Sequence, residues 1–258
     1  MDGSASSVSF TDLYGRLGTA ASPMLLDVRR NDAFGKDDRM IVGAVRRSPE
    51  DVERWSGEIP GGRPVVAYCV HGHEVSQGVA ASLRQAGLNA AYLDGGIAAW
   101  KDAGLATRKK LGAIENKWVT REHPKIDRIA CPWLISRFIN PRAEFLYVPA
   151  NDVTAVAKTE AATPYDITGA EFGHVGDQCS FDSIIRIFEI SDPALDHLAT
   201  IVRGADTSRP DLTPQCEGLL AVSYGLSANY PDDHEMLKHG MVIYDALYTW
   251  CRMQKQER

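Results

Sequence analysis

The stretch PVVAYCVHGHEVSQGVAASLRQAGLNAAYL, residues 64–93, decides the fold predicted for the first part of the chain. Its two ends, PVVAYC and AAYL, are short apolar runs bounded by breaking residues, which is typical of strands buried in a parallel sheet. Between them Val79, Leu83 and Ala86 recur at helical spacing, and Gly87 is expected to end the helix. A strand, a helix and a strand at this spacing predict a βαβ unit.

The chain changes character near residue 110. PMLLDV, residues 23–28, is a further apolar run bounded by a breaker, whereas the charged stretch 107–117, TRKKLGAIENK, has no strong apolar period and is interpreted as a linker. We therefore predict an α/β domain over residues 1–110, with a parallel sheet flanked by helices. A mainly α-helical domain is predicted over residues 111–258.

Helical patterns dominate the second part. The run 124–139 places apolar residues around a broad face, with a proline at its expected first turn and Pro132 expected to kink or break it. A helix that opens at Asp192 is expected to end at Gly204. Two more helices and one short strand are predicted at residues 214–226, 232–253 and 144–148, respectively.

Composition narrows the functional classes. The formal net charge of -6 argues against a nucleic-acid-binding surface, which usually needs a basic excess. The apolar runs are far too short to span a bilayer, and the first residues, MDGSASSVSF, do not resemble a secretory signal. Five widely spaced cysteines make no disulfide framework, so a cytoplasmic protein with reduced thiols is expected.

Cys69 is the first candidate functional residue. It ends a predicted buried strand, and a helix is expected to begin near Ser76, so backbone N–H groups and the positive helix end should face the sulfur. Both favour the thiolate and predict a nucleophilic cysteine. One alternative is a buried structural cysteine. Another is a metal site shared with His71 and His73, which is disfavoured because a closed zinc site needs four ligands and these residues supply three.

Four separated segments, LLDVRRNDAF, IVGAVRRSP, YCVHGHEVSQG and YLDGGIAAW, resemble the rhodanese family of single-domain sulfurtransferases across residues 8–106. The resemblance implies that the thiolate of Cys69 accepts sulfane sulfur as a persulfide, from thiosulfate or a protein persulfide, without a cofactor. Asp27 and Arg29 are interpreted as residues that tie down a loop. The residues expected to contact the substrate are those of the loop: Val70, His71, Gly72, His73, Glu74, Val75 and Ser76.

This loop departs from the ordinary sulfurtransferase pattern. It has seven residues before Ser76, which resembles rhodanese-like phosphatases and arsenate reductases, and Glu74 matches a glutamate of their loop. Their loop closes on an arginine, whereas this one has Val75, so a doubly charged anion loses a bidentate partner. The loop length makes thiol-dependent reduction of chromate or arsenate the second enzymatic hypothesis, and the missing arginine counts against it.

Three stretches of the second part concentrate side chains that bind metals. They are HPKIDRIAC, GAEFGHVGDQCSFD and DDHEMLKHG, at residues 123–131, 169–182 and 232–240. Mixtures of histidine and carboxylate suit zinc, iron or manganese. The alternative is structural, because Asp232 and Asp233 also suit a helix cap and Asp127 has arginines nearby.

Long segments of the second part look like the C-terminal domain of the ChrB-type chromate-resistance proteins, across residues 115–253. They include WVTREHPKIDRIACPWLISRFINPRAEFLYV, PYDITGAEFGHVGDQCSFD, IVRGADT and DDHEMLKHGMVIYDALYTWC. The resemblance implies a role in chromate resistance or sensing, and a non-enzymatic sensor that binds a metal or chromate is a third hypothesis. Within these segments we predict, from residue type, a metal or oxyanion site formed by Asp127, Glu171, His174 and His234.

Overall fold

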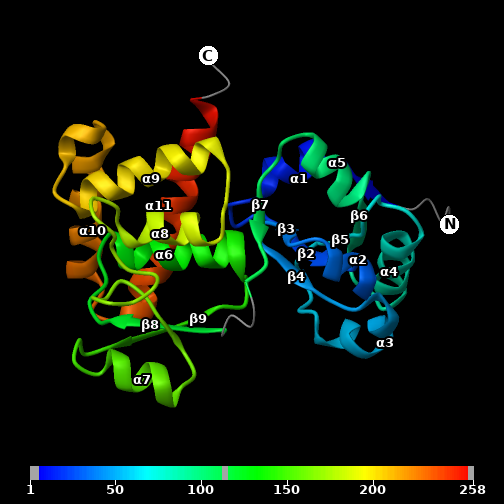
Figure 1. Cartoon of the computed structure of the whole chain (residues 1–258), viewed down its shortest axis with the longest axis horizontal. Helices are drawn as coiled ribbons and strands as arrows, with labels where there is room; N and C mark the ends of the chain where they lie inside the picture. Colours follow the sequence, from blue (N-terminus) through cyan, green and yellow to red (C-terminus); the bar gives the residue numbers. More distant parts are fainter. Residues whose placement is uncertain (1–5, 112–115, 255–258) are drawn as a thin grey trace. The chain divides into compact units, whose positions relative to one another are not determined.

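The computed structural model describes residues 6–111 and 116–254 (Figure 1). The chain forms two compact units, Met1–Lys110 with Arg137–Pro141 and Leu111–Ser136 with Arg142–Arg258, and each is described by itself. In the described ranges, no helix combines the length and apolar character that crossing a membrane requires.

A five-stranded parallel sheet forms the centre of the first unit, in the order β1-β6-β5-β2-β4. In chain order the strands are β1 (Ser7–Val8), β2 (Met24–Asp27), β4 (Ala44–Arg46), β5 (Val65–Tyr68) and β6 (Ala90–Leu93). β5 is buried at every position, as its continuous apolar sequence predicts for a strand covered on both faces. The predicted α/β fold with a parallel sheet is confirmed for this unit.

A second, two-stranded antiparallel sheet pairs β3 (Arg39–Ile41) with β7 (Thr107–Lys109). The interpretation of residues 107–117 as a linker is therefore wrong at its beginning, and residues 112–115 lie outside the described residues. Arg39 explains the pairing in part, because its guanidinium donates to the hydroxyl and carbonyl oxygens of Thr107 at 3.1 and 3.2 Å. β7 was not predicted because its residues are polar or charged and form no apolar run.

Five α-helices of the first unit lie in the described part of the chain. They are α1 (Phe10–Arg16), α2 (Asn31–Lys36), α3 (Val52–Trp55), α4 (Glu74–Gln85) and α5 (Gly96–Asp102). α4 buries Val79 and Leu83 against Leu26 and Ala67 of the sheet in one hydrophobic cluster. This helix begins at Glu74, two residues before the predicted start at Ser76.

The second unit contains a small parallel sheet in the order β10-β8-β9, where the sequence predicted only β9. The strands are β8 (Lys117–Arg121), β9 (Glu144–Val148) and β10 (Thr163–Pro164). Helix α7 (Val153–Thr159) packs on this sheet, with Val153 and Val119 in one buried cluster. The remaining helices are α6 (Asp127–Leu134), α8 (Ser180–Ile187), α9 (Pro193–Asp206), α10 (Gln215–Asn229) and α11 (Asp233–Met253).

Two helix boundaries differ from prediction in ways that affect the site. α6 begins at Asp127 rather than in the proline-containing turn before it, because Ile126 has φ 37° and breaks the helical path. Pro132 does not end the helix, which continues to Leu134 and then a π-helical turn at Ile135–Ile139. α9 continues past Gly204, whose missing side chain makes room for the sulfur of Cys216, 2.3 Å from where a Cβ would lie.

Candidate functional site

Cys69 lies directly after β5, where its sulfur faces the beginning of α4. The residue is 7% exposed, and its Sγ lies 3.2 Å from the hydroxyl oxygen of Ser76, which is fully buried. Backbone N–H groups of His71, His73 and Ser76 also hydrogen-bond the sulfur. The loop therefore surrounds one sulfur atom with donors, as the sequence predicted.

These donors control the ionisation of the thiol. Burial alone raises the pKa of Cys69, but the hydrogen bonds from the Ser76 hydroxyl and the three backbone amides outweigh it. The net result is a pKa below the ordinary value of a cysteine. Because the thiolate is the nucleophilic form, the loop prepares Cys69 to attack an electrophilic atom.

The turn at the end of β6 holds the loop in place. The N–H groups of Ile97 and Ala98, in the first turn of α5, donate to the carbonyl oxygens of Cys69 and Val70, both at 3.0 Å. A Cβ on Gly96 would lie 2.5 Å from the Cys69 carbonyl oxygen, so only glycine permits this approach. With the carbonyls held on this side, the loop amides are free to face the sulfur.

Asp27 and Arg29 tie down the loop after β2, as the sequence analysis favoured. Both are at most 1% exposed, and the guanidinium of Arg29 donates to both carboxylate oxygens of Asp27 at 2.6–3.0 Å. Arg29 also pairs with Asp37 at 2.7 Å, and the Tyr68 hydroxyl donates to Asp27 at 2.9 Å. The charge of Arg29 is thus compensated inside the protein.

A cavity of about 700 Å³ opens in front of Cys69. Gly72 and Ser76, predicted as substrate contacts, are buried and do not line this cavity. Ser76 instead contacts the Cys69 sulfur, and Gly72 is part of the loop backbone. Sequence reasoning missed Gln77, whose amide donates to the Gly72 carbonyl at 3.0 Å. The lining comprises Arg29, Arg30, Asp32, Ala33, Cys69, Val70, His71, His73, Glu74, Val75 and Gln77.

In the second unit the structure brings together only two of the four predicted ligands. Asp127 and His174 come together, with His174 Nε2 at 3.4 Å from Asp127 Oδ2. Glu171 is exposed, and exposed His234 on α11 packs edge-on against the ring of Tyr147. In the described residues, neither Glu171 nor His234 belongs to the group of three closely spaced ligand atoms, which comprises Asp127, His174 and Asp206.

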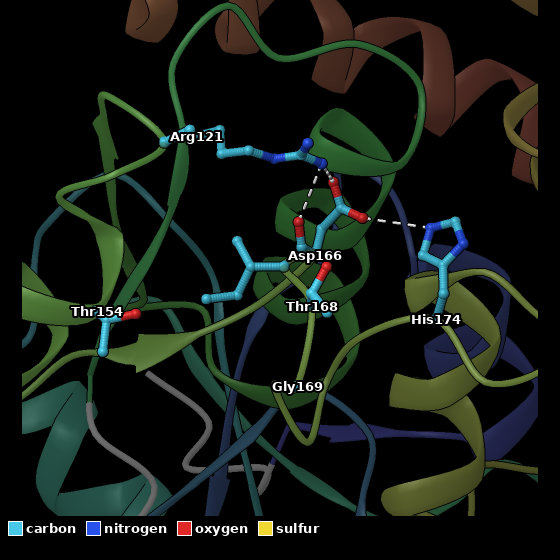
Figure 2. Close-up of a pocket in the computed structure, with 8 residues that line it drawn as sticks. Arg121, Thr154, Asp166, Thr168, Gly169 and His174 are labelled. Carbon is cyan, nitrogen blue, oxygen red and sulfur yellow. Dashed lines mark hydrogen bonds and ion pairs between the residues drawn. The ribbon is translucent and has the colours of Figure 1, made fainter.

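Two aspartates that the sequence analysis did not single out lie against the same imidazole, and one of them, Asp206, completes the group. His174 Nε2 lies 3.3 Å from Asp166 Oδ1 and 3.2 Å from Asp206 Oδ2. Figure 2 shows Asp166 between His174 and Arg121, whose guanidinium donates to the Asp166 carboxylate at 2.9 Å. The string DITGAEFGH, residues 166–174, carried a usable signal, because a turn with two glycines can return its ends to one place.

Asp127 is positioned by the first turn of α8. Its carboxylate accepts the backbone N–H groups of Ser180 at 2.6 Å and Phe181 at 3.0 Å, and it is 1% exposed. The strained residue before it, Ile126, is held by a hydrogen bond from the buried Tyr244 hydroxyl to its carbonyl at 2.9 Å. The orientation of Asp127 is therefore fixed from both sides.

The crowding of carboxylates around one imidazole shifts their ionisation. Hydrogen bonds to Asp127 and then Asp166 raise the pKa of His174 to about 10, against a smaller opposing effect of burial. Burial, followed by the charges of Asp127 and Asp166, raises the pKa of Asp206 to about 7. The imidazole of His174 is therefore a cation at neutral pH, and it lies against the carboxyl groups of three aspartates, Asp127, Asp166 and Asp206.

Comparison with known families gives two matches. The family model of the ChrB C-terminal domain matches residues 118–251, just over half of the chain, and the model of the rhodanese-like domain matches residues 9–103. Both resemblances noted in the sequence are thereby confirmed.

Two curated relatives correspond to these parts. Protein ChrB of Cupriavidus metallidurans is 34% identical over 134 residues, which are 52% of this chain and 40% of that protein. The chain thus matches less than half the length of this relative. The thiosulfate sulfurtransferase GlpE of Shewanella oneidensis is 34% identical over 85 residues, 33% of this chain and 81% of GlpE.

Solved structures similar to the chain include a rhodanese-related protein from Thermoplasma volcanium and a rhodanese-like domain protein from Staphylococcus aureus. The first is 24% identical with a TM-score of 0.35, and covers 40% of this chain and 96% of its own. The second is 19% identical with a TM-score of 0.36, and covers 42% and 99%.

Proposed function

The chain belongs to the family defined by the ChrB C-terminal domain, and from this premise we propose that it takes part in chromate resistance as a sulfurtransferase with Cys69 as its nucleophile. One observation carries the catalytic part. The Ser76 hydroxyl and three backbone amides direct hydrogen bonds at the Cys69 sulfur and favour its thiolate.

The proposed reaction has two transfers of one sulfur atom. The Cys69 thiolate attacks the outer, sulfane sulfur of thiosulfate, a sulfur–sulfur bond forms, and sulfite leaves with the electron pair of the broken bond. An acceptor thiolate or cyanide then attacks the outer sulfur of the persulfide and releases the Cys69 thiolate. The terminal persulfide sulfur is an anion, and the loop amides that face Cys69 suit an anion in this position.

Sulfur transfer fits the loop better than reduction of chromate or arsenate. The position of the arginine in oxyanion enzymes is held by Val75, which is half-buried and packs against the hydrophobic cluster of the first unit. The nearby guanidinium of Arg29 is already paired with Asp27 and Asp37. Neither the loop nor Arg29 therefore offers a doubly charged oxyanion the bidentate guanidinium that usually holds it.

The donor is proposed to be thiosulfate or a protein persulfide, and the compartment the cytoplasm. The cavity in front of Cys69, about 700 Å³, has room for a small donor. All five cysteines are buried free thiols, which suits a reducing compartment.

Steady-state formation of thiocyanate from thiosulfate and cyanide tests the catalytic proposal. Cys69→Ser should lower the rate by about a thousandfold or more, because a serine hydroxyl remains protonated at neutral pH. Cys216→Ser is the matched control, since the Cys216 sulfur already lies 3.3 Å from the Thr213 hydroxyl and is far from the loop in sequence. Equal rates in wild type and Cys69→Ser would refute the role of Cys69.

The chromate part is tested by growth on chromate of cells whose own copy of the gene has been deleted. Wild-type protein should restore tolerance, and Cys69→Ser should fail to restore it at equal expression. Full tolerance with Cys69→Ser would separate chromate resistance from sulfur transfer and contradict the combined proposal.

A further inference from the structure

The second unit holds a constellation of ligand atoms that the sulfur chemistry does not use. One nitrogen and carboxylate oxygens of Asp127, His174 and Asp206 lie within 4.8 Å of one another. They come from three separate places: the first residue of α6, the loop before α8 and the last residue of α9. We propose that these three residues bind one divalent transition-metal ion, of the class Mn²⁺, Fe²⁺ or Zn²⁺.

The spacing of the atoms supports this assignment. Two atoms bound to the same ion at roughly 2.1 Å are separated by about 3.0–3.5 Å in octahedral or tetrahedral geometry. His174 Nε2 lies 3.4 Å from Asp127 Oδ2 and 3.2 Å from Asp206 Oδ2. The two separations therefore match edges of a coordination shell, and a small movement of the side chains would admit the ion.

The donor chemistry selects the class of ion. One imidazole and two carboxylates form a set of nitrogen and oxygen ligands, which suits manganese, iron and zinc. Magnesium and calcium prefer oxygen ligands, so the imidazole argues for a transition metal. The set offers no thiolate, which distinguishes it from the cysteine-rich structural zinc sites.

Charge balance gives an independent reason. Asp127 is 1% exposed and Asp206 is 16% exposed, so both carboxylates lie in a largely water-excluded place. Arg121 and Arg128 contact the neighbouring Asp166, at 2.9 and 3.4 Å, rather than these two. Two carboxylates in such a place need compensating charge, and the imidazole of His174 between them can carry only one positive charge, whereas a dication would supply two.

Hydrogen bonds from surrounding residues fix the orientation of the carboxylates near the proposed ion. Asp127 is oriented by the α8 backbone amides, and Asp166 by Arg121 and by the Ser180 hydroxyl at 3.1 Å. Asp166 also lies 3.3 Å from His174 Nε2, so it is assigned a positioning role beside the ligands. Metal sites usually depend on such outer hydrogen bonds to fix their ligands.

The group is also accessible from outside. His174, 42% exposed, lines two cavities of about 630 and 640 Å³. The first includes Arg121, Thr154 and Asp166, drawn in Figure 2, and the second includes Asp206. An ion can therefore enter from solvent, and three protein ligands leave coordination positions for water or another small molecule.

Metal titration of the full-length protein tests the proposal. The protein is stripped with a chelator, dialysed, and titrated separately with Mn²⁺ and Zn²⁺ by calorimetry, with about one ion bound per chain as the expected result. His174→Ala and Asp206→Asn should weaken binding by about tenfold or more. With Mn²⁺, pulsed electron paramagnetic resonance should detect a coordinated nitrogen in wild type that is absent from His174→Ala.

Glu171→Gln and His234→Ala are matched controls, because they remove ligand-type side chains of the same unit that lie outside the group. Both should bind the ion as wild type does, and circular dichroism should show that all four variants are folded. Asp206→Asn retains the shape of the side chain, so it decides the matter if His174→Ala does not fold. The proposal is overturned by wild type that binds neither ion saturably, by unchanged binding in folded Asp206→Asn, or by equal losses in the controls.

Discussion

Both units direct the first turn of a helix at an ionisable side chain, and the two arrangements differ in the distance along the sequence that separates their parts. In the first unit, the Cys69 sulfur and the amides that face it lie within residues 69–76. In the second, Asp127 accepts the amide of Ser180, 53 residues later. A local strand–loop–helix turn creates the first arrangement, whereas only the complete fold of the unit creates the second.

The two ionisable groups also have different neighbours. Cys69 lines a cavity and has one hydroxyl and several amides around it, so a small molecule in the cavity can reach its sulfur. Asp127 is surrounded by two amides, an imidazole and further carboxylates. The beginning of a helix therefore faces the proposed nucleophile in one unit and a proposed metal ligand in the other.

Removing the anion of the second unit should have the larger effect on folding. Asp127→Ala leaves the buried N–H groups of Ser180 and Phe181 without their acceptor, which should cost about 2–4 kcal/mol of local stability. Hydrogen exchange followed by mass spectrometry should show amides of α8 exchanging at least about thirtyfold faster.

Asp177→Ala is the control for this loss, because Asp177 is an exposed aspartate of the same unit outside the ligand group. It should leave exchange in α8 unchanged. Normal protection of α8 in Asp127→Ala would mean that the helix does not depend on this carboxylate, and the parallel between the two units would fail.

A smaller effect is expected when the hydroxyl donor of the first unit is removed. Hydrogen bonds lower the pKa of Cys69 below its ordinary value, so Ser76→Ala should raise that pKa. Since only the thiolate reacts, the rise in alkylation rate with pH should move to higher pH. At neutral pH the rate should fall by a factor on the order of three to ten.

Ser82→Ala, a half-buried serine farther along α4, is the matched control and should leave the pH profile in place. Iodoacetamide labelling of the Cys69 peptide at a series of pH values gives the measurement. An unchanged profile in Ser76→Ala would assign the activation of the thiol to the backbone amides alone.

These contrasts explain what the sequence could predict. The strands around Cys69 and the strand–loop–helix turn follow from neighbouring residues, and the structure has the parallel sheet that they indicated. The nucleophilic role of Cys69 rests on the same residues and stays a prediction. β7 was missed because a charged edge pair leaves no apolar run to detect. The early end assigned to α9 has a different cause: Gly204 serves close packing against Cys216, a contact made by tertiary structure.

The candidate ligands show the limit most clearly. Asp127 and His174 were chosen for their residue type and do come together, but Glu171 and His234 were chosen on the same ground and lie outside the group. Asp206 is the last residue of a helix that was predicted to end at Gly204, so the sequence did not indicate its carboxylate as a ligand. Residue type identifies candidates, whereas convergence of distant segments selects among them.

The central claim is that Cys69 accepts sulfane sulfur, and the mass of the intact protein tests it most directly. Full-length protein, reduced and then incubated with thiosulfate, should gain the mass of one sulfur atom, located by fragmentation on the peptide that contains Cys69. Cyanide should remove that mass, and Cys69→Ser should never acquire it. The account is contradicted if wild type with a free Cys69 thiol gains no sulfur, or if Cys69→Ser gains the same mass.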